Sequence, residues 1–340
     1  MTTKRVYILG AGASAPSGVP VVKGFFNAIE DSKHSGAKHF QTFMRGYQAL
    51  RGVHAKGRLD TQNIEEVLGA FELAQLCEEQ LVNDVDPKEL VDAAKRVIGD
   101  VIAERSKIRV EYRTTSNTVG PSASKIEPPL GYRSLTKTKN ASFITFNQDL
   151  MLEYALWLDK VRFHHAGLQD ADSVPIIKLH GSLNWERDEK SKAVMVHDPN
   201  KVFASQRREW FDEPLPGNDT LIHEKTLPTI AHTPLIVPPS WAKYAHYLPI
   251  SAVWKAAVAA LRAAQEIYVI GYSLPESDFF FRHLFAIGTL SDTRIRKFLL
   301  IDPNAGQTQA RYRRLLGAEL EHVFESRASS FGGMKEADFE

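Results

Sequence analysis

The feature that most constrains the fold is a short apolar run, residues 6–9, that leads directly into a glycine-rich turn at Gly10 and Gly12. A strand followed by such a turn and then by a helix is typical of parallel α/β sheets. Apolar runs of similar length recur at residues 142–146, 161–164, 176–179, 235–237, 267–270 and 298–301. Short continuous runs indicate strands that are covered on both faces. We therefore predict an α/β fold with a doubly wound, mostly parallel, Rossmann-like sheet.

Helical patterns fill the intervals between the runs, at residues 149–158, 249–264 and 278–290. Two long segments interrupt this alternation, so the sheet domain is assigned to residues 1–20 and 140–325. The remaining parts are predicted to be a mainly helical insertion at residues 21–139, an irregular insertion at residues 184–233 and a C-terminal tail at residues 326–340.

Inside the first insertion, one helix is expected to open near Thr61 and another at Asp86 and Pro87. Proline is favoured at the first position of a helix, which makes the second start well defined. The polar stretch at residues 114–129 is predicted to be a mobile loop.

Composition excludes several classes of protein. The chain of 340 residues has a formal net charge of +1, which is too weak to indicate a nucleic acid or a membrane surface as partner. Cys77 is the single cysteine, so neither an intrachain disulfide nor a cysteine-rich zinc site is possible. No apolar run reaches the roughly 18 residues of a membrane span, and the N-terminal run is typical of a buried strand rather than a signal peptide. We expect a cytoplasmic protein that needs no metal.

The glycine turn is the first candidate ligand site. Gly10, Ala11, Gly12 and Ser14 follow the first strand, and such a turn lets backbone N–H groups approach a pyrophosphate. The alternative is a tight turn without a ligand. An acidic residue that binds ribose should follow a second strand about twenty residues later. No convincing strand precedes the acidic residues found there, so an ordinary nicotinamide dehydrogenase is not expected.

Polar residues also follow two later strands. Asn147 and Asp149 come after the run at 142–146, and His180 comes after the run at 176–179. Ligands of open α/β sheets lie at the carboxyl ends of strands. Asn147 would orient a ribose or a water molecule, and His180 would act as general base. The alternatives are helix caps for Asn147 and Asp149 and a structural histidine for His180.

Two further motifs end strands near the C-terminus. Gly271 and Ser273 follow the run at 267–270, and Asp302 and Asn304 follow the run at 298–301. Their small or polar side chains suit phosphate and ribose groups. The alternative is helix capping, for which Ser277 or Asp278 is a further candidate.

Taken in order, these motifs resemble the sirtuin superfamily. The match comprises Gly-Ala-Gly-Ala-Ser at 10–14, Thr-Phe-Asn-Gln-Asp at 145–149, Leu-His-Gly-Ser at 179–182, Gly-Tyr-Ser at 271–273 and Ile-Asp-Pro-Asn at 301–304. The resemblance implies a sirtuin-type fold and an NAD substrate, with Asn147 and His180 as catalytic residues. It also implies that NAD contacts Gly10, Ala11, Gly12, Ser14, Pro20, Asp149, Gly271, Ser273, Asp302 and Asn304.

Departures from the family pattern narrow the expected activity. The stretch at 17–22 keeps Gly-x-Pro, with Pro20, but lacks the Asp-Phe-Arg that follows in deacylases, and the four-cysteine zinc module is absent. The stretch at 271–278 and the long insertion before residue 145 look instead like the bacterial sirtuin-like proteins of antiphage defence. The resemblance implies an NAD+ hydrolase that depletes NAD.

The same resemblance implies partners. They include a sensor such as a HerA-like ATPase or an Argonaute-type protein. A homo-oligomer is also expected, because a freely active NAD+ hydrolase would harm its host and its site must be kept inactive. Alternative functions are an NAD-dependent deacylase or ADP-ribosyltransferase, and a non-catalytic module that binds NAD or ADP-ribose. Direct nucleic-acid binding is a weaker alternative, through a basic face made of Arg207, Arg208, Arg311, Arg313 and Arg314, because a solvated helix face accounts better for such charges.

Overall fold

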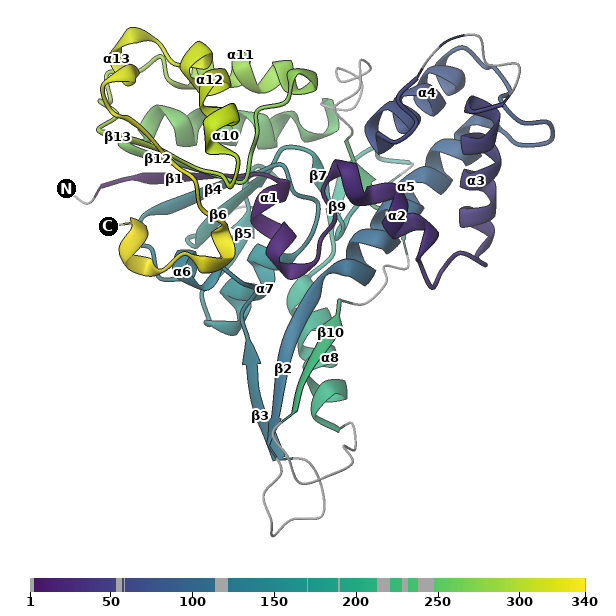
Figure 1. Cartoon of the computed structure of the whole chain (residues 1–340), viewed down its shortest axis with the longest axis horizontal. Helices are drawn as coiled ribbons and strands as arrows, with labels where there is room; N and C mark the ends of the chain where they lie inside the picture. The colour runs from purple at the N-terminus through teal and green to yellow at the C-terminus, as the bar shows by residue number, and fades with distance from the viewer. Residues whose placement is uncertain are drawn as a thin grey trace.

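A seven-stranded parallel sheet forms the centre of the molecule in the computed structural model (Figure 1). The structure describes residues 3–52, 57, 59–113, 122–169, 171–188, 190–212, 221–227, 232–237 and 248–339. The strands are β1 (Arg5–Leu9), β4 (Ala141–Thr145), β5 (Phe163–His165), β6 (Val174–Lys178), β12 (Glu266–Ile270), β13 (Lys297–Ile301) and β14 (Phe324–Arg327). The predicted doubly wound α/β class is therefore confirmed.

The spatial order of the strands is β14-β13-β12-β1-β4-β6-β5. Apart from the edge strand β5, this is the 3-2-1-4-5-6 order of dinucleotide-binding sheets, with β1 as the first strand. The chain leaves β1 toward β4 and β6 and later returns to the other side of β1 to form β12. The reversal lies between β1 and β12, which is the topological switch point where such sheets bind ligands.

Helices cover both faces of the sheet because the strand residues alternate between two apolar clusters. Tyr7 and Leu9 of β1 belong to one cluster, and Val6 and Ile8 belong to the other. The second cluster is covered by α10 (Ser251–Ala263), α11 (Phe279–Gly288) and α12 (Ala305–Leu315). The first is covered by α7 (Met151–Leu158), by the helical insertion and by the C-terminal segment. The central strands β1, β4, β12 and β13 are thus shielded from water on both sides, as their apolar sequences require, whereas the edge strand β14 is largely exposed.

The first insertion packs as a group of helices beside the sheet (Figure 1). Its helices are α2 (Phe25–Glu30), α3 (Lys38–Leu50), α4 (Ile64–Leu76) and α5 (Pro87–Arg105). The predicted start at Asp86 and Pro87 is confirmed, and the Asp86 carboxylate accepts a hydrogen bond from the Lys88 N–H at 2.7 Å. Asn63 caps α4 in the same way, so that helix begins slightly later than Thr61, where the sequence placed its start.

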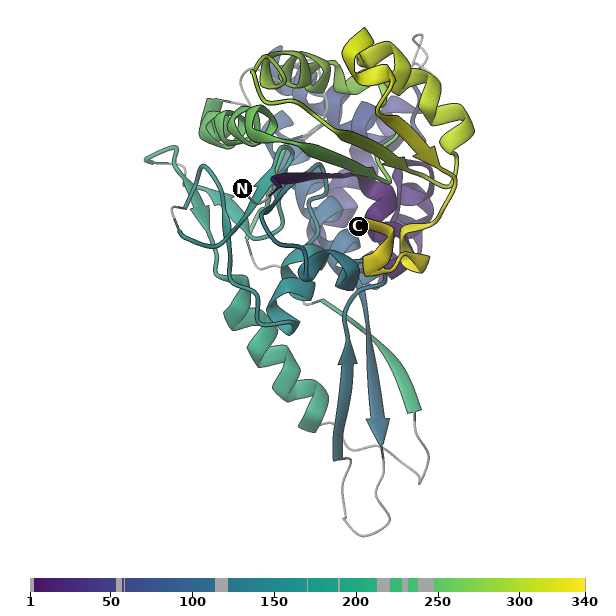
Figure 2. The same ribbon diagram turned by 90° about the vertical axis from the view of Figure 1, so that its left-hand side faces the viewer.

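The insertion is not purely helical. β2 (Lys107–Arg113) and β3 (Ser122–Glu127) pair with β10 (Leu221–Thr226) in an antiparallel sheet that projects from the domain together with α8 (Pro199–Asp212) (Figures 1 and 2). The prediction of a loop over 114–129 is wrong for β3, and residues 114–121 lie outside the described residues. The pairing of β2 with β10 joins two distant segments, which local sequence does not encode.

The segment predicted to be irregular contains regular structure. Besides α8 and β10, it includes the hairpin β8 (Trp185–Arg187) and β9 (Val194–Val196). The run predicted as a fifth sheet strand is β11 (Leu235–Ile236), which pairs antiparallel with β7 (Gly181–Ser182) outside the main sheet. The prediction of a strand is confirmed, but the prediction that this strand belongs to the main sheet is wrong.

The C-terminal segment belongs to the core. β14 continues across the predicted boundary at residue 325 and pairs with β13. Phe331 and Phe339 are then buried in the cluster that contains Tyr7. The short elements not yet given are α1 (Ala11–Ser14), α6 (Arg133–Thr136), α13 (Ala318–Glu321) and the 3₁₀ turns Ala15–Ser17, Val22–Gly24, Leu248–Ile250, Glu276–Asp278, Phe331–Gly333 and Glu336–Phe339. Among the described residues, no helix has the length and apolar character needed to cross a bilayer.

Candidate functional site

The five sequence motifs meet at one edge of the sheet. The register pairs Leu9 with both Ile270 and Thr145, pairs Ile270 with Ile301, and pairs Thr145 with Lys178. These strands therefore end at the same level. The glycine turn, the Asn147 segment, the His180 segment, the Gly271 segment and the Asp302 segment all begin there, as the sequence predicted.

The glycine turn after β1 packs directly on the turn after β12. A Cβ atom at Gly10 would lie 2.6 Å from the Gly271 carbonyl oxygen, and one at Gly271 would lie 2.4 Å from the Ala13 nitrogen. The Gly12 N–H donates to the Gly271 carbonyl at 2.9 Å. Glycine is required at these positions for the close approach of two backbones. One N–H that the sequence assigned to a pyrophosphate is thus used within the protein.

Asn147 is held by the glycine turn. Its Nδ2 donates to the Gly10 carbonyl at 2.9 Å and to the Ser14 Oγ at 3.0 Å. Ser14 Oγ also lies 2.7 Å from the hydroxyl of Tyr132, and all three side chains are buried. With both Nδ2 hydrogens committed, Oδ1 is the acceptor that the amide can offer to a ligand.

Tyr132 is a member of this network that the sequence did not indicate. Burial is the largest cause that raises its pKa well above the ordinary value, and Asp149 adds to it, whereas hydrogen bonds with Ser14 and Asn147 act in the opposite direction. Burial thus disfavours ionisation of this phenol. It lies just before α6, more than a hundred residues from Ser14, so no local pattern connects the two.

His180 lies beside a carboxylate. Its Nε2 is 3.4 Å from Asp278 Oδ1, and both side chains are 6% exposed. The hydroxyl of Tyr272 donates to Asp278 Oδ2 at 3.0 Å. The ring of Phe146 stacks on Tyr272 with centroids 4.0 Å apart and meets His180 edge-on at 5.1 Å. Aromatic walls and a carboxylate thus fix the orientation of the imidazole.

Asp278 differs from its expected role. It occupies the position before α11, but its side chain makes no capping hydrogen bond. The carboxylate faces Tyr272 and His180 instead. The sequence suggested a cap because Asp278 precedes a helix, and no local signal reveals that His180 lies across from it.

Asp149 has a structural role. Its Oδ1 accepts a hydrogen bond from the Met151 N–H at 2.9 Å, where α7 begins. Asp149 lies one residue before Leu150, the N-cap of α7, so its carboxylate supports the first turn of the helix without being the N-cap that the sequence suggested. The backbone of Asp149 is held as well. The Nζ of Lys178 donates to the Asp149 carbonyl and, at 2.8 Å, to the Glu153 carboxylate. Lys178 and Glu153 form an ion pair that is almost wholly buried.

The remaining candidates differ in exposure. Ala11, Ser273 and Asn304 are exposed, whereas Gly12, Pro20 and Gly271 are half-buried. The Ser273 carbonyl accepts from Arg311 at 2.9 Å. Asp302 is buried and accepts from the Asn304 N–H at 2.7 Å. Ala11, Ser273 and Asn304 are therefore the candidates with the most solvent-accessible surface for a ligand.

A cavity of about 550 Å³ opens at the opposite edge of the sheet. Its lining includes Lys4, Asn140 and Arg162, which lie at the amino ends of strands or beside them. Parallel sheets bind ligands at the carboxyl ends, and none of the predicted site residues lines this cavity. The candidate functional site is therefore the edge where the five motifs meet, called the motif edge below.

The five arginines proposed as a basic face do not lie together. Arg207 and Arg208 belong to α8, and the other three belong to α12. Both views place α8 beside the projecting antiparallel sheet and α12 at the far end of the molecule (Figures 1 and 2). The single basic face is thus contradicted.

Comparisons with known proteins give similarity at the level of structure alone. No protein-family model matches the chain, and no curated protein matches its sequence. The structure "Sir2-p53 peptide-NAD+" is similar with 15% identity and a TM-score of 0.38, covering 97% of this chain and 89% of that chain. "Structural Basis for the Mechanism and Regulation of Sir2 Enzymes" has 12% identity and a TM-score of 0.37 over the same shares. "Sir2 bound to acetylated peptide" has 14% identity and a TM-score of 0.31, again over 97% and 89%. Similarity at this level leaves the function to be argued from the residues of the site.

Proposed function

We propose that this protein binds NAD+ and hydrolyses its nicotinamide–ribose bond at the motif edge. The observation that carries the proposal is the meeting of the glycine turn, Asn147 and His180 at the switch point of a sheet with dinucleotide-binding strand order. A dinucleotide has two ribose groups and a pyrophosphate, and this edge offers an amide, an imidazole and a glycine turn that begins a short helix.

Binding would follow the arrangement of the strands. The turn at Gly10, Ala11 and Gly12 would lie against the pyrophosphate, with the Ser14 hydroxyl and Pro20 behind it. The exposed Ser273 and Asn304 would reach the adenosine side, supported by Gly271 and Asp302. Asp149 would act through the backbone at the start of α7.

The chemical step would use Asn147 and His180. Asn147 Oδ1 would accept a hydrogen bond from a ribose hydroxyl or from the attacking water. A neutral His180 ring that donates Nε2–H toward Asp278 carries its lone pair on Nδ1 and can take the water proton. The C1′–N bond breaks, its electron pair leaves with nicotinamide, and the water oxygen bonds to C1′. The products are nicotinamide, ADP-ribose and one proton.

The biological setting is proposed from the resemblance of the motifs. NAD depletion would act in antiphage defence, in the cytoplasm, with a homo-oligomer and a HerA-like ATPase or an Argonaute-type sensor. The lone cysteine supports hydrolysis over deacylation, because no four-cysteine module is possible. Transfer of ADP-ribose to another acceptor would share the same bond cleavage.

The decisive experiment measures NAD+ loss and nicotinamide release by the purified protein, alone and with the product of the neighbouring gene. His180→Ala should lower turnover by roughly two to four orders of magnitude, the range for a lost general base. His283→Ala is the matched control, because His283 lies on the exposed side of α11 and bonds only a backbone carbonyl there.

Three outcomes would contradict the proposal. Full activity in His180→Ala removes the catalytic assignment. Turnover of an acetylated peptide that requires NAD+ assigns a deacylase. Tight NAD+ binding without turnover under every activating condition assigns a non-catalytic binding module.

A further inference from the structure

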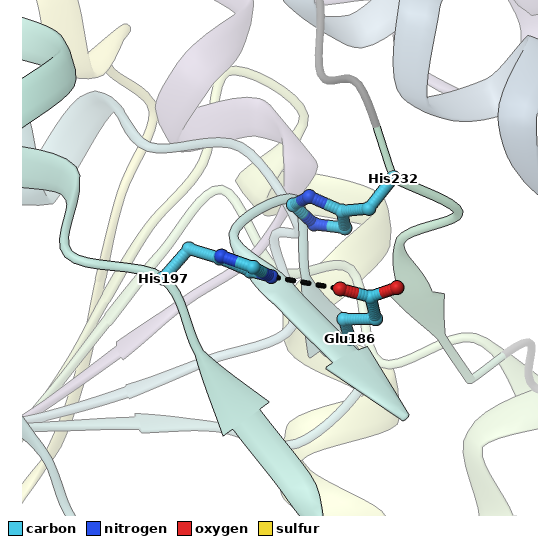
Figure 3. A group of neighbouring side chains, drawn as sticks. All are labelled: Glu186, His197 and His232. Carbon is cyan, nitrogen blue, oxygen red and sulfur yellow. Dashed lines mark hydrogen bonds and ion pairs between the residues drawn. The ribbon is translucent and has the colours of Figure 1, made fainter. Parts of the chain in front are cut away.

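We propose that Glu186, His197 and His232 form a binding site for a divalent transition-metal ion of the Zn²⁺ class. Their ligand atoms all lie within 4.8 Å of one another. They are the one such group of three among the residues described. Figure 3 shows the three side chains pointing toward one another from separate segments. The inference stands apart from the proposed NAD chemistry, because it concerns ion binding away from His180.

The backbone holds two of the donors in a defined geometry. Trp185 pairs with Val196 in the β8–β9 hairpin, and Glu186 pairs with Met195. Glu186 and His197 are thus diagonal neighbours on one face, a separation that long side chains bridge. The Glu186 Oε2 lies 2.9 Å from the His197 Nε2.

A buried amide anchors this hairpin. The Asn184 side chain donates from Nδ2 to the backbone carbonyl of His197 at 2.8 Å. The backbone carbonyl of Asn184 accepts from the His197 N–H, also at 2.8 Å. Ser182 in turn donates to the Asn184 Oδ1 at 2.7 Å. The residue that carries the exposed imidazole is therefore fixed at its backbone, which lowers the ordering cost of binding an ion.

The third donor comes from the chain that enters β11. The ring of His232 lies nearly parallel to that of His197, with centroids 4.2 Å apart. Its Nε2 lies 3.0 Å from the Leu183 carbonyl. A carbonyl only accepts, so this contact makes Nε2 the protonated nitrogen and leaves the lone pair on Nδ1. Histidines that bind metals commonly donate their other N–H to a backbone carbonyl in this way.

Two imidazoles and one carboxylate are a donor set that Zn²⁺ and neighbouring metals prefer. Ligand atoms about 2.1 Å from one ion are roughly 3.4 Å apart in tetrahedral geometry. The Glu186–His197 separation of 2.9 Å is shorter than that value, and no separation among the three ligand atoms exceeds 4.8 Å. His197 is exposed and Glu186 is half-buried, so water can complete the coordination.

The site would join segments that flank the proposed active site. β11 pairs with β7, whose Gly181 follows His180 directly. Pro234, two residues after His232, packs against Gly99 of α5. A Cβ atom built on Gly99 would lie only 2.9 Å from the Cγ of Pro234. A bound ion would thus link the β8–β9 hairpin to the segment at residues 232–236, which contacts both α5 and the strand that follows His180. The lone cysteine excluded a cysteine-rich zinc site, and it placed no limit on a site made of histidines and a carboxylate.

The test uses the untagged protein stripped with a chelator and dialysed. Equilibrium dialysis with Zn²⁺ should give about one bound ion per chain, and Co²⁺ should give visible absorption bands of a low-coordinate site. His197→Ala and His232→Ala should each weaken binding by at least about 10- to 100-fold, the loss that follows removal of even an outer-shell partner. Glu186→Gln keeps the shape and should also weaken binding.

His39→Ala is the matched control, because His39 pairs with the single carboxylate of Asp100 at 2.8 Å. It should bind Zn²⁺ as the wild type does. The proposal is overturned if the wild type shows no saturable binding near one ion per chain, or if His197→Ala and His232→Ala bind like His39→Ala. Neither result depends on whether the protein turns over NAD+.

Discussion

The Nε2 of His180 lies 3.4 Å from Oδ1 of Asp278, and the two residues approach from different strand ends. The carboxylate is held on its other oxygen by Tyr272. Because both groups are nearly excluded from water, their interaction is weakly screened. In the proposed reaction, Asp278 would therefore be a positioning residue for the imidazole, in the manner of a carboxylate that orients a histidine base.

Asp278→Asn tests this role. The amide keeps the shape but loses the charge, so kcat for NAD+ cleavage should fall while KM changes little. The loss should be smaller than the roughly two to four orders of magnitude expected for His180→Ala. Groups that act as one unit are not additive. The double variant should therefore be no slower than His180→Ala alone, and a further loss in it would argue that Asp278 acts separately.

Gly271→Ala tests the packing of the two turns. The new Cβ would lie 2.4 Å from the Ala13 nitrogen at a backbone φ of +59°, so the turns must separate. A loss of several kcal/mol in unfolding free energy and a loss of NAD+ binding are expected, measured by urea unfolding and titration calorimetry. Gly306→Ala is the control, because a Cβ there meets open space at the start of α12. Equal effects of the two changes would refute the close-packing explanation.

Tyr132→Phe tests the network around Asn147. Removing the hydroxyl leaves Ser14 without its 2.7 Å partner, and the expected cost is about 0.5–1.5 kcal/mol in unfolding free energy. Tyr154→Phe is matched to it, because the Tyr154 hydroxyl is buried without a hydrogen-bond partner among the described residues. That variant should be neutral or slightly more stable. Chemical denaturation of both proteins decides the point.

Lys178→Met tests the buried ion pair beneath Asp149. The change leaves the Glu153 carboxylate buried without its partner at 2.8 Å, and breaking such a pair costs about 3–5 kcal/mol. Lys137→Met is the control, because its ion pair with Glu336 is exposed and should contribute less than about 1 kcal/mol. A similar small loss in both variants would contradict this interpretation.

The stability of the Lys178→Met variant should also depend on pH. Burial raises the pKa of Glu153 and the charge of Lys178 lowers it, so removing Lys178 should raise that pKa further. A carboxyl whose pKa is higher in the folded state destabilises the fold when it ionises. The destabilisation should be complete above the raised pKa and should vanish as pH falls below the ordinary pKa of glutamate. Urea unfolding at several pH values measures this trend, and a loss that grows toward acidic pH would contradict it.

The sequence by itself determined six of the seven strands of the main sheet and the residues that follow them, but it did not indicate β14 and it assigned the run at 235–237 to this sheet wrongly. The run before Gly10 and the run before Asn147 are short, continuous and apolar, and such strands are stable only when both faces are covered. That requirement fixes a parallel sheet, and a parallel sheet brings the ends of its strands to one edge. The meeting of Asn147 and His180 at that edge therefore followed from local pattern and one general rule.

Only the tertiary structure decided the partners of those residues. Asp278 reaches His180, Tyr132 reaches Ser14, and His232 reaches Glu186 across long intervals of sequence. The pairing of β2 with β10 and the burial of Phe339 are equally remote. The physical reason is that periodicity and capping report interactions within a few residues, whereas these contacts depend on how separate elements pack. Local sequence thus located the strand ends, and packing between distant segments selected the groups that surround them.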